Sequence, residues 1–231
     1  MTPKVLSVQV GRPKTHPVPT GAGDDEDEDD VQSFFRSGID KRPVAGAIAV
    51  GPLGLEGDQV EDTRVHGGPD QAVLAYAAAH YPRWRSEWGR DDVTHGGFGE
   101  NLTVEGFDEL TVCLGDRWRI GSVVLEVTKP RSPCNRLAWF QRREDLIQRV
   151  RLTGRSGWYL RVLTPGQLAA GMPIELIERR CPDFSVRRAA LAMGDRTNNP
   201  AEASALMQCE ALAADWRLRL AREGVQRLAP T

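Results

Sequence analysis

The sequence predicts a mainly β protein with few helices, followed by a small helical region. Two observations favour this fold class. Between residues 37 and 177, short apolar runs alternate with glycine and proline, a pattern typical of many short strands that close or nearly close into a barrel. After residue 183 the composition changes to alanine, leucine and arginine without a strand pattern. We therefore expect a β-barrel domain over residues 1–182 and a three-helix domain over residues 183–231.

The first strand is predicted by VLSVQVG, residues 5–11, because apolar and polar residues alternate there. The acidic run Asp24–Asp30 follows it. This run repels itself and offers nothing to bury, so we expect a solvated loop rather than a metal-binding tail. Seven further apolar runs, each broken off by turn residues, predict the later strands: VAGAIAV, QAVLAY, ENLTV, DRWRI, SVVLEVTKP, GWYLRVL and PIELIE.

Two helices are predicted between these strands. The first covers residues 77–88, where Pro82 suits a position in the first turn. The second covers residues 138–154, because apolar residues recur there at helical spacing before Gly154.

Capping residues predict three short helices at the C-terminal end. Ser185 caps the first, Asn199 and Glu202 form a capping box for the second, and the third ends at Gly224. Three helices of this kind more often pack on a neighbouring domain or subunit than read DNA. We therefore expect packing against the barrel or a partner.

Charge and composition exclude several classes of partner. The formal net charge is −2 and the isoelectric point is near 6.1, so the chain has no overall basic field of the kind that binds nucleic acid. Neither a signal peptide nor an apolar run of membrane-spanning length is visible. We expect a soluble, cytoplasmic protein that binds neither nucleic acid nor membranes.

The four cysteines, Cys113, Cys134, Cys181 and Cys209, are scattered without a C-x-x-C pair, so we expect free thiols. Cys134 differs from the others because its segment, VTKPRSPCNRL, surrounds it with cations and prolines. Positive charge stabilises the thiolate, the form that attacks electrophiles and binds soft metals. The alternative is a partly buried thiol in a stiff loop whose arginines form salt bridges elsewhere.

Two histidine–glycine–glycine turns begin at His66 and His95. Paired glycines, such as Gly67 and Gly68, let the backbone approach a ligand and expose amide groups to anions. On its own the pattern is weak, because glycine pairs usually mark ordinary turns.

Four polar residues lie in or after glycine turns. Glu100 and Asn101 enter a strand directly from such a turn, and they either orient a ligand or satisfy turn amides. Asp58 and Asp116 each follow a glycine before a strand, where an aspartate commonly accepts backbone hydrogen bonds, so we expect a structural role for both.

Five ordered segments resemble the MOSC domain family, named after the C-terminal domain of molybdenum cofactor sulfurase, and are most similar to its YiiM-like branch: SGIDKRPV, GLEGDQVEDTRVHGGPDQAVLAY, GFGENLTVEGFDE, GDRWRIGSVVLEVTKPRSPCNRL and GRSGWYLRVLTPG. The resemblance spans residues 5 to 180, and the helices that follow resemble the three-helix domain of that branch. It implies a bent, mostly antiparallel β-barrel with a pocket built from loops. It also matches Cys134, His66 and Arg131 to motif residues of the family.

The resemblance further implies a molybdenum cofactor, with Cys134 as the metal ligand and His66 as a catalytic partner. Arg131, Lys41 and Arg136 would hold anionic oxygens, and the remaining candidates for cofactor binding are Gly67, Gly68, Glu100 and Asn101. In relatives, the activity is the reductive detoxification of N-hydroxylated bases and similar small molecules. Electrons would come from a separate reductase, because the chain has no flavin, haem or iron–sulfur motif.

A noncatalytic carrier of molybdopterin, or of sulfur held as a persulfide on Cys134, needs the same residues, so enzyme and carrier stay open at this level. The family also leads us to expect a homodimer. MOSC proteins are sometimes linked to pyridoxal phosphate, but no lysine here lies in a pattern that favours a Schiff base.

Overall fold

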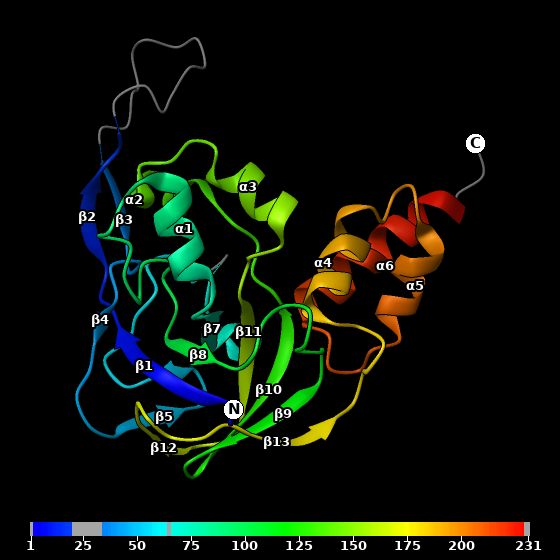
Figure 1. Cartoon of the computed structure of the whole chain (residues 1–231). Coiled ribbons are helices and arrows are strands. Elements are labelled where there is room, and N and C mark those ends of the chain that lie inside the picture. The colour runs from blue at the N-terminus through cyan, green and yellow to red at the C-terminus, as the bar shows by residue number, and fades with distance from the viewer. Residues whose placement is uncertain (1, 20–33, 64–65, 229–231) are drawn as a thin grey trace.

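A curled eight-stranded sheet forms the centre of the computed structural model, which describes residues 2–19, 34–63 and 66–228 (Figure 1). Its strands run in the order β13 (Glu175–Arg179), β9 (Asp116–Ile120), β10 (Val123–Pro130), β11 (Trp158–Thr164), β7 (Val73–Ala77), β8 (Leu102–Glu105), β1 (Lys4–Val10) and β4 (Arg42–Pro43). Neighbours are antiparallel except for β7 and β8, which are parallel. The mainly β prediction is confirmed. The sheet, however, ends at edge strands β13 and β4, so it is a half-barrel rather than a closed barrel.

Smaller elements extend this sheet. A three-stranded sheet has the order β12 (Gly166–Leu168), β5 (Ile48–Gly51) and β6 (Gly54–Leu55), and a two-stranded sheet pairs β2 (Lys14–Pro17) with β3 (Phe34–Ser37). A short 3-10 helix, η1 (Pro69–Gln71), precedes β7. The acidic run Asp24–Asp30 lies outside the described residues, so its predicted role as a solvated loop stays a prediction.

Three helices, α1 (His80–Trp88), α2 (Asn135–Gln141) and α3 (Leu146–Thr153), lie together at one end of the sheet (Figure 1). They cover an aromatic core in which the rings of Tyr76 and Phe98 stack with centroids 4.4 Å apart. The single helix predicted over residues 138–154 is wrong. The chain breaks at Arg142, which adopts a left-handed backbone conformation with φ 54°, and resumes after Asp145.

The C-terminal helices are α4 (Val186–Gly194), α5 (Pro200–Met207) and α6 (Ala214–Leu228). Both predicted caps are confirmed, because Ser185 accepts a hydrogen bond from the Arg188 amide and Asn199 accepts one from the Glu202 amide. The predicted end at Gly224 is wrong, since α6 continues to Leu228. Glycine inside a helix costs only about 1 kcal/mol, and the preceding turns carry the helix past it.

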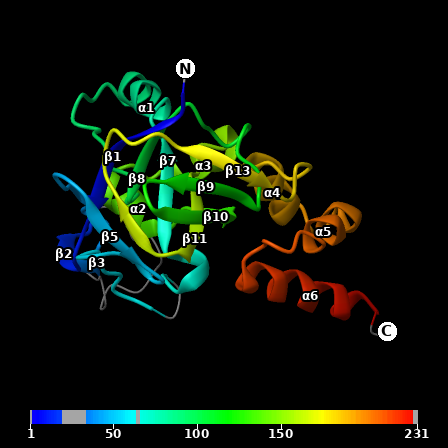
Figure 2. The same cartoon turned by 90° about the horizontal axis from the view of Figure 1, so that it is seen from below.

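Helix α4 packs against β10, and α5 contacts both α4 and α6 (Figure 2). One hydrophobic cluster joins the two parts, and it includes fully buried Trp118 of β9, Val186 of α4 and Leu206 of α5. The expected packing of the helices on the β domain is therefore observed, whereas the domain boundary near residue 183 stays a prediction. None of the helices within the described ranges combines the length and hydropathy that a membrane-spanning segment needs.

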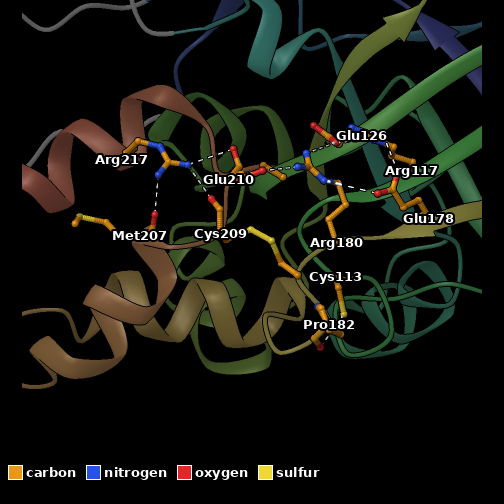
Figure 3. Close-up of a disulfide and its surroundings, with 12 residues drawn as sticks. Cys113, Arg117, Glu126, Glu178, Arg180, Pro182, Met207, Cys209, Glu210 and Arg217 are labelled. Carbon is orange, nitrogen blue, oxygen red and sulfur yellow. Dashed lines mark hydrogen bonds and ion pairs between the residues drawn. A yellow bond between two sulfur atoms is a disulfide. The ribbon is translucent and has the colours of Figure 1, made fainter.

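A disulfide joins Cys181, shortly after the end of β13, to Cys209, shortly after the end of α5 (Figure 3). The expectation of four free thiols is therefore wrong for these two residues. Helices α4 and α5 turn the chain back on itself, which brings together cysteines 28 positions apart in the sequence. The Arg180–Glu210 ion pair lies beside the disulfide and joins the same two segments. Cys113 and Cys134 remain as free thiols.

Candidate functional site

One cavity of ≈ 360 Å³ opens between the end of β10, the turn His66–Gly68 and the start of β7. Nearly all of the residues that the sequence singled out line it: Lys41, His66, Gly67, Gly68, Asn101, Arg131, Cys134 and Arg136. We call it the cysteine cavity. A shallower hollow, which shares His66, Cys134 and Arg136 with it, continues toward β2 and β3.

Cys134 sits between β10 and α2. Strand β10 ends at Pro130, and the prolines on both sides of Arg131 prevent a helix from starting before the cysteine. Cys134 then has an extended backbone and precedes the first residue of α2. Its thiol is partly exposed and lines the cavity, whereas the other free cysteine, Cys113, is buried elsewhere. Among the described residues, Cys134 is therefore the only thiol that a cavity ligand can reach.

Cations surround this thiol. Arg131 is buried, with 7% of its surface exposed, and its backbone amide donates to the carbonyl of Gly157 at 3.0 Å, which fixes the loop to β11. Arg136, on the first turn of α2, lines the same cavity. Lys129, also buried, is neutralised by Asp215 of α6, so that ion pair ties the C-terminal helices to the strand that leads to the site.

His66 faces the same cavity. Burial lowers the pKa of its imidazole, and the positive charges of Arg136 and Arg131 lower it further, while Asp62 opposes them. The ring is therefore neutral at pH 7, and a neutral imidazole offers one hydrogen-bond donor and one acceptor. A charge-neutral polar group thus stands beside a cationic wall.

Lys41 reaches the cavity but is already paired. Its ammonium contacts the carboxylate of Asp58, and these side chains are 8% and 11% exposed. Asp58 also accepts hydrogen bonds from the Gly11 amide at 2.8 Å and from the side-chain amide of Asn101 at 2.9 Å. Asn101 in turn accepts from the Leu74 amide at 3.0 Å. Asp58 therefore joins Lys41 and Asn101 in the cavity wall. This contact reaches further along the chain than the local turn role that the sequence predicts for Asp58.

Glu100 lies outside the cavity lining and is fully buried. Its carboxylate accepts hydrogen bonds from the amides of Gly96 and Phe98 at 2.7 and 3.1 Å, from Thr103 at 2.8 Å, and from the hydroxyl of Tyr81. Of the two interpretations of this residue, the satisfaction of turn amides matches these contacts. Asp116 also accepts a hydrogen bond from a nearby amide, that of Cys113, as expected of its turn.

Gly67 and Gly68 form the first histidine–glycine–glycine turn, with φ values of 77° and 81° that other residues rarely adopt. A Cβ atom added to Gly68 would meet nothing within 4 Å, whereas one added to Gly67 would meet the side chain of Val60 at 3.0 Å. The turn therefore presents bare backbone to the cavity.

Sequence reasoning missed Tyr159 and the apolar wall. Tyr159 lies on β11 between two fully buried residues, Trp158 and Leu160, so alternation along the strand aims it at the opposite face, into the cavity. Burial raises the pKa of Tyr159, and the nearby cation of Arg131 opposes this increase. Phe98 also touches the cavity, although its ring is buried and stacked on Tyr76. The alternation in GWYLRVL was a usable signal, but it predicts only a face and not a neighbour.

Comparison with known proteins gives a consistent family assignment. The model of the MOSC domain matches residues 62–175. Protein YiiM of Escherichia coli (strain K12) is 35% identical over 182 residues, which cover 78% of this chain and 81% of YiiM. The crystal structure of YiiM from Geobacillus stearothermophilus matches 98% of this chain and 100% of its own, with a TM-score of 0.77 and 32% sequence identity.

A third relative places a similar segment in a larger protein. A protein of Gibberella moniliformis (strain M3125 / FGSC 7600) named Reductase is 37% identical over 153 residues, which are 65% of this chain but only 27% of that protein. The coverage of most of one YiiM protein and of all of the other, together with the match to the MOSC domain, establishes the family. This chain belongs to the MOSC domain family and is a YiiM-like protein.

Proposed function

We propose that this chain binds a molybdenum cofactor and reduces N-hydroxylated bases or related N-oxygenated compounds with electrons from a separate reductase. The observation that carries the proposal is the shared cavity of a partly exposed thiol, Cys134, and two guanidinium groups, Arg131 and Arg136. The association of the MOSC domain with the molybdenum cofactor supports it.

The donor set fits such a cofactor. A thiolate is a soft ligand of the kind that molybdenum accepts, and guanidinium groups bind oxyanions and phosphate through paired hydrogen bonds. In our proposal Cys134 is the metal ligand, while Arg131 and Arg136 hold anionic oxygens. Gly67 and Gly68 would add backbone contacts, because no side chain of their own stands between the turn and the ligand.

When bound, the cofactor supplies the two-electron chemistry that the side chains of this chain lack. The balanced reaction converts a hydroxylamine, R–NH–OH, with two electrons and two protons into the amine R–NH₂ and water, as the N–O bond breaks. His66 is the residue of this chain that we assign to hydrogen bonding at the N–OH group, because its ring is neutral at pH 7 and faces the cavity.

The electron donor is proposed to be a separate protein. The chain itself shows no flavin, haem or iron–sulfur motif. The fungal relative named Reductase is much longer than the segment it shares with this chain, which supports a partnership between a MOSC-like module and other parts of a reductase.

The test is metal and pterin analysis of the wild type, Cys134→Ser and Cys113→Ala, each produced in cells that make the molybdenum cofactor. Cys113 is the matched control, because it is the other free cysteine and is buried away from the cavity. We expect molybdenum and pterin in the wild type and in Cys113→Ala, and loss of both metal and N-hydroxylated-base reduction in Cys134→Ser. Equal molybdenum in all three proteins, or none in any, contradicts the proposal. A persulfide on Cys134, detected by mass spectrometry without any turnover, would favour a sulfur carrier instead.

A further inference from the structure

A separate hollow of ≈ 960 Å³ shares Lys41 with the cysteine cavity, since this residue lines both spaces. It is formed by the loop that includes β4, by α1 and the loop after it, and by the end of α2. We call it the arginine hollow, after the arginines in its lining: Arg42, Arg85, Arg90, Arg142 and Arg143. Of the candidate residues that line the cysteine cavity, only Lys41 also lines the arginine hollow.

Positive charge dominates this hollow. Its lining contains six cationic side chains but only two carboxylates. Three arginines have carboxylate partners: Arg42 with Asp40, Arg90 with Asp92, and Arg143 with Asp145. The two others do not. Within the described residues, the Arg85 guanidinium donates only to the backbone carbonyl of Val93, at 3.2 Å. The side chain of Arg142 makes no hydrogen bond or ion pair there, while its backbone amide donates to the carbonyls of Ala138 and Trp139. Neither guanidinium group therefore has a salt-bridge partner among the described residues, and the carboxylate whose charge reaches Arg142, that of Asp92, is already paired with Arg90.

The backbone of Arg142 points to the same conclusion. Arg142 is the only residue other than glycine with positive φ among the described residues. Helices α1 and α3 end in the same left-handed conformation, but there the residues are Gly89 and Gly154, which adopt it without steric cost. Arginine at such a position is strained relative to glycine, and strain of this kind is concentrated at functional sites. In return for this strain, the position carries a guanidinium group in the lining of the hollow.

The floor of the hollow is the second histidine–glycine–glycine turn, His95–Gly97. The buried carboxylate of Glu100 holds this turn through the Gly96 amide, and the side-chain amide of Gln141 donates to the Gly97 carbonyl. The ring of His95 packs edge-on against Tyr81 with centroids 5.0 Å apart. The turn is therefore fixed before any ligand arrives, which lowers the cost of binding.

We propose that the arginine hollow binds a small diphosphate-bearing anion, such as a nucleoside diphosphate, at a site separate from the cysteine cavity. Guanidinium groups bind phosphate oxygens through paired, charge-assisted hydrogen bonds. Two arginines without a salt-bridge partner suit a ligand with two phosphate groups better than a single carboxylate, and the volume leaves room for more than the diphosphate. The proposal does not depend on the chemistry at Cys134.

The test is isothermal titration calorimetry of the full chain with inorganic pyrophosphate and with ADP, without divalent cations, at 50 and 150 mM salt. We compare the wild type with Arg142→Gly, Arg85→Gln, Arg222→Ala and Cys134→Ser. Arg222, an exposed arginine of α6, is the matched control for lost charge. We expect binding in the wild type that weakens as salt increases, and an affinity about tenfold lower in Arg142→Gly and Arg85→Gln. Arg222→Ala and Cys134→Ser should bind as the wild type does.

Arg142→Gly separates ligand binding from folding, because glycine favours the left-handed conformation, so its melting temperature should equal or exceed that of the wild type. The proposal is overturned if neither anion binds the wild type at millimolar concentration in 50 mM salt, or if Arg142→Gly binds as tightly as the wild type. It is also overturned if Cys134→Ser alone loses binding, since the anion then occupies the cysteine cavity.

Discussion

At the scale of single residues, the buried Lys41–Asp58 ion pair forms part of the wall of the cysteine cavity. Asp58→Asn keeps an acceptor for the Gly11 amide but leaves a buried ammonium group without a counter-charge. We expect the free energy of unfolding at pH 7 to fall by about 3 kcal/mol, because breaking a buried ion pair leaves one charge uncompensated. Urea unfolding measures this loss. A Lys41→Met/Asp58→Asn double variant is the control and should recover much of the stability, since it removes both charges.

The pH dependence of this variant follows from the same pair. Burial lowers the pKa of Lys41 below its usual 10.5, and Asp58 opposes that decrease, so the pKa falls further in Asp58→Asn. Between the folded pKa and the unfolded value, the folded state binds fewer protons than the unfolded state. The stability of Asp58→Asn should therefore rise with pH through this window, and more steeply than that of the wild type. Parallel stability curves from pH 6 to 9 would contradict this account of the pair.

Individual candidate residues could be predicted better than their contacts. Cys134, Arg131 and His66 were identified as candidates from sequence motifs, and the structure brings all three to one cavity. The partner of Lys41 could not be predicted in this way, because the Lys41–Asp58 contact depends on how two loops 17 residues apart are placed. Tyr159 was missed because strand alternation gives a direction but not the cavity into which it points.

At the scale of elements, helix α4 rests on a local cap that can be tested alone. The Ser185 hydroxyl accepts a hydrogen bond from the Arg188 amide at 3.1 Å. Ser185→Ala should lower the free energy of unfolding by about 1 kcal/mol, because it leaves an amide of the first turn without its acceptor. Urea unfolding checks this value, and Ser185→Asp, which restores an acceptor, is the control. Equal stability of the alanine and aspartate variants would show that the cap is dispensable.

Elements were predictable where the signal is local. The caps of α4 and α5 involve residues three positions apart, and both are present. The break between α2 and α3 was not predictable, because apolar spacing continues across it while Arg142 turns the backbone. The end of α6 was misplaced for the opposite reason, since a local signal at Gly224 is overridden within a continuing helix.

At the scale of the whole molecule, long-range pairing decides what local patterns leave open. Strand β1 lies between β8 and β4, although neither neighbour is adjacent to it in the sequence. The C-terminal helices share a hydrophobic core with the sheet and reach Lys129, close to the site, through Asp215. The free-thiol prediction failed at Cys181 for the same reason, because its partner approaches only after two helices have reversed the chain.

The disulfide should therefore stabilise the attachment of these helices. Cys181 and Cys209 are 28 residues apart, and closing a loop of that length removes unfolded-state entropy worth about 3–4 kcal/mol. We expect the free energy of unfolding of Cys181→Ser/Cys209→Ser, measured in urea, to be lower than that of the oxidised wild type by that amount. Wild-type protein treated with dithiothreitol should match the double variant, and dithiothreitol should leave the double variant unchanged, which separates the disulfide from other effects of the reductant. Hydrogen exchange should locate the loss in α4 and α5, because the disulfide closes the loop that contains these two helices, whereas the Lys129–Asp215 pair still ties α6 to β10. Uniform loss of protection across the sheet would mean that sheet and helices unfold as a single cooperative unit.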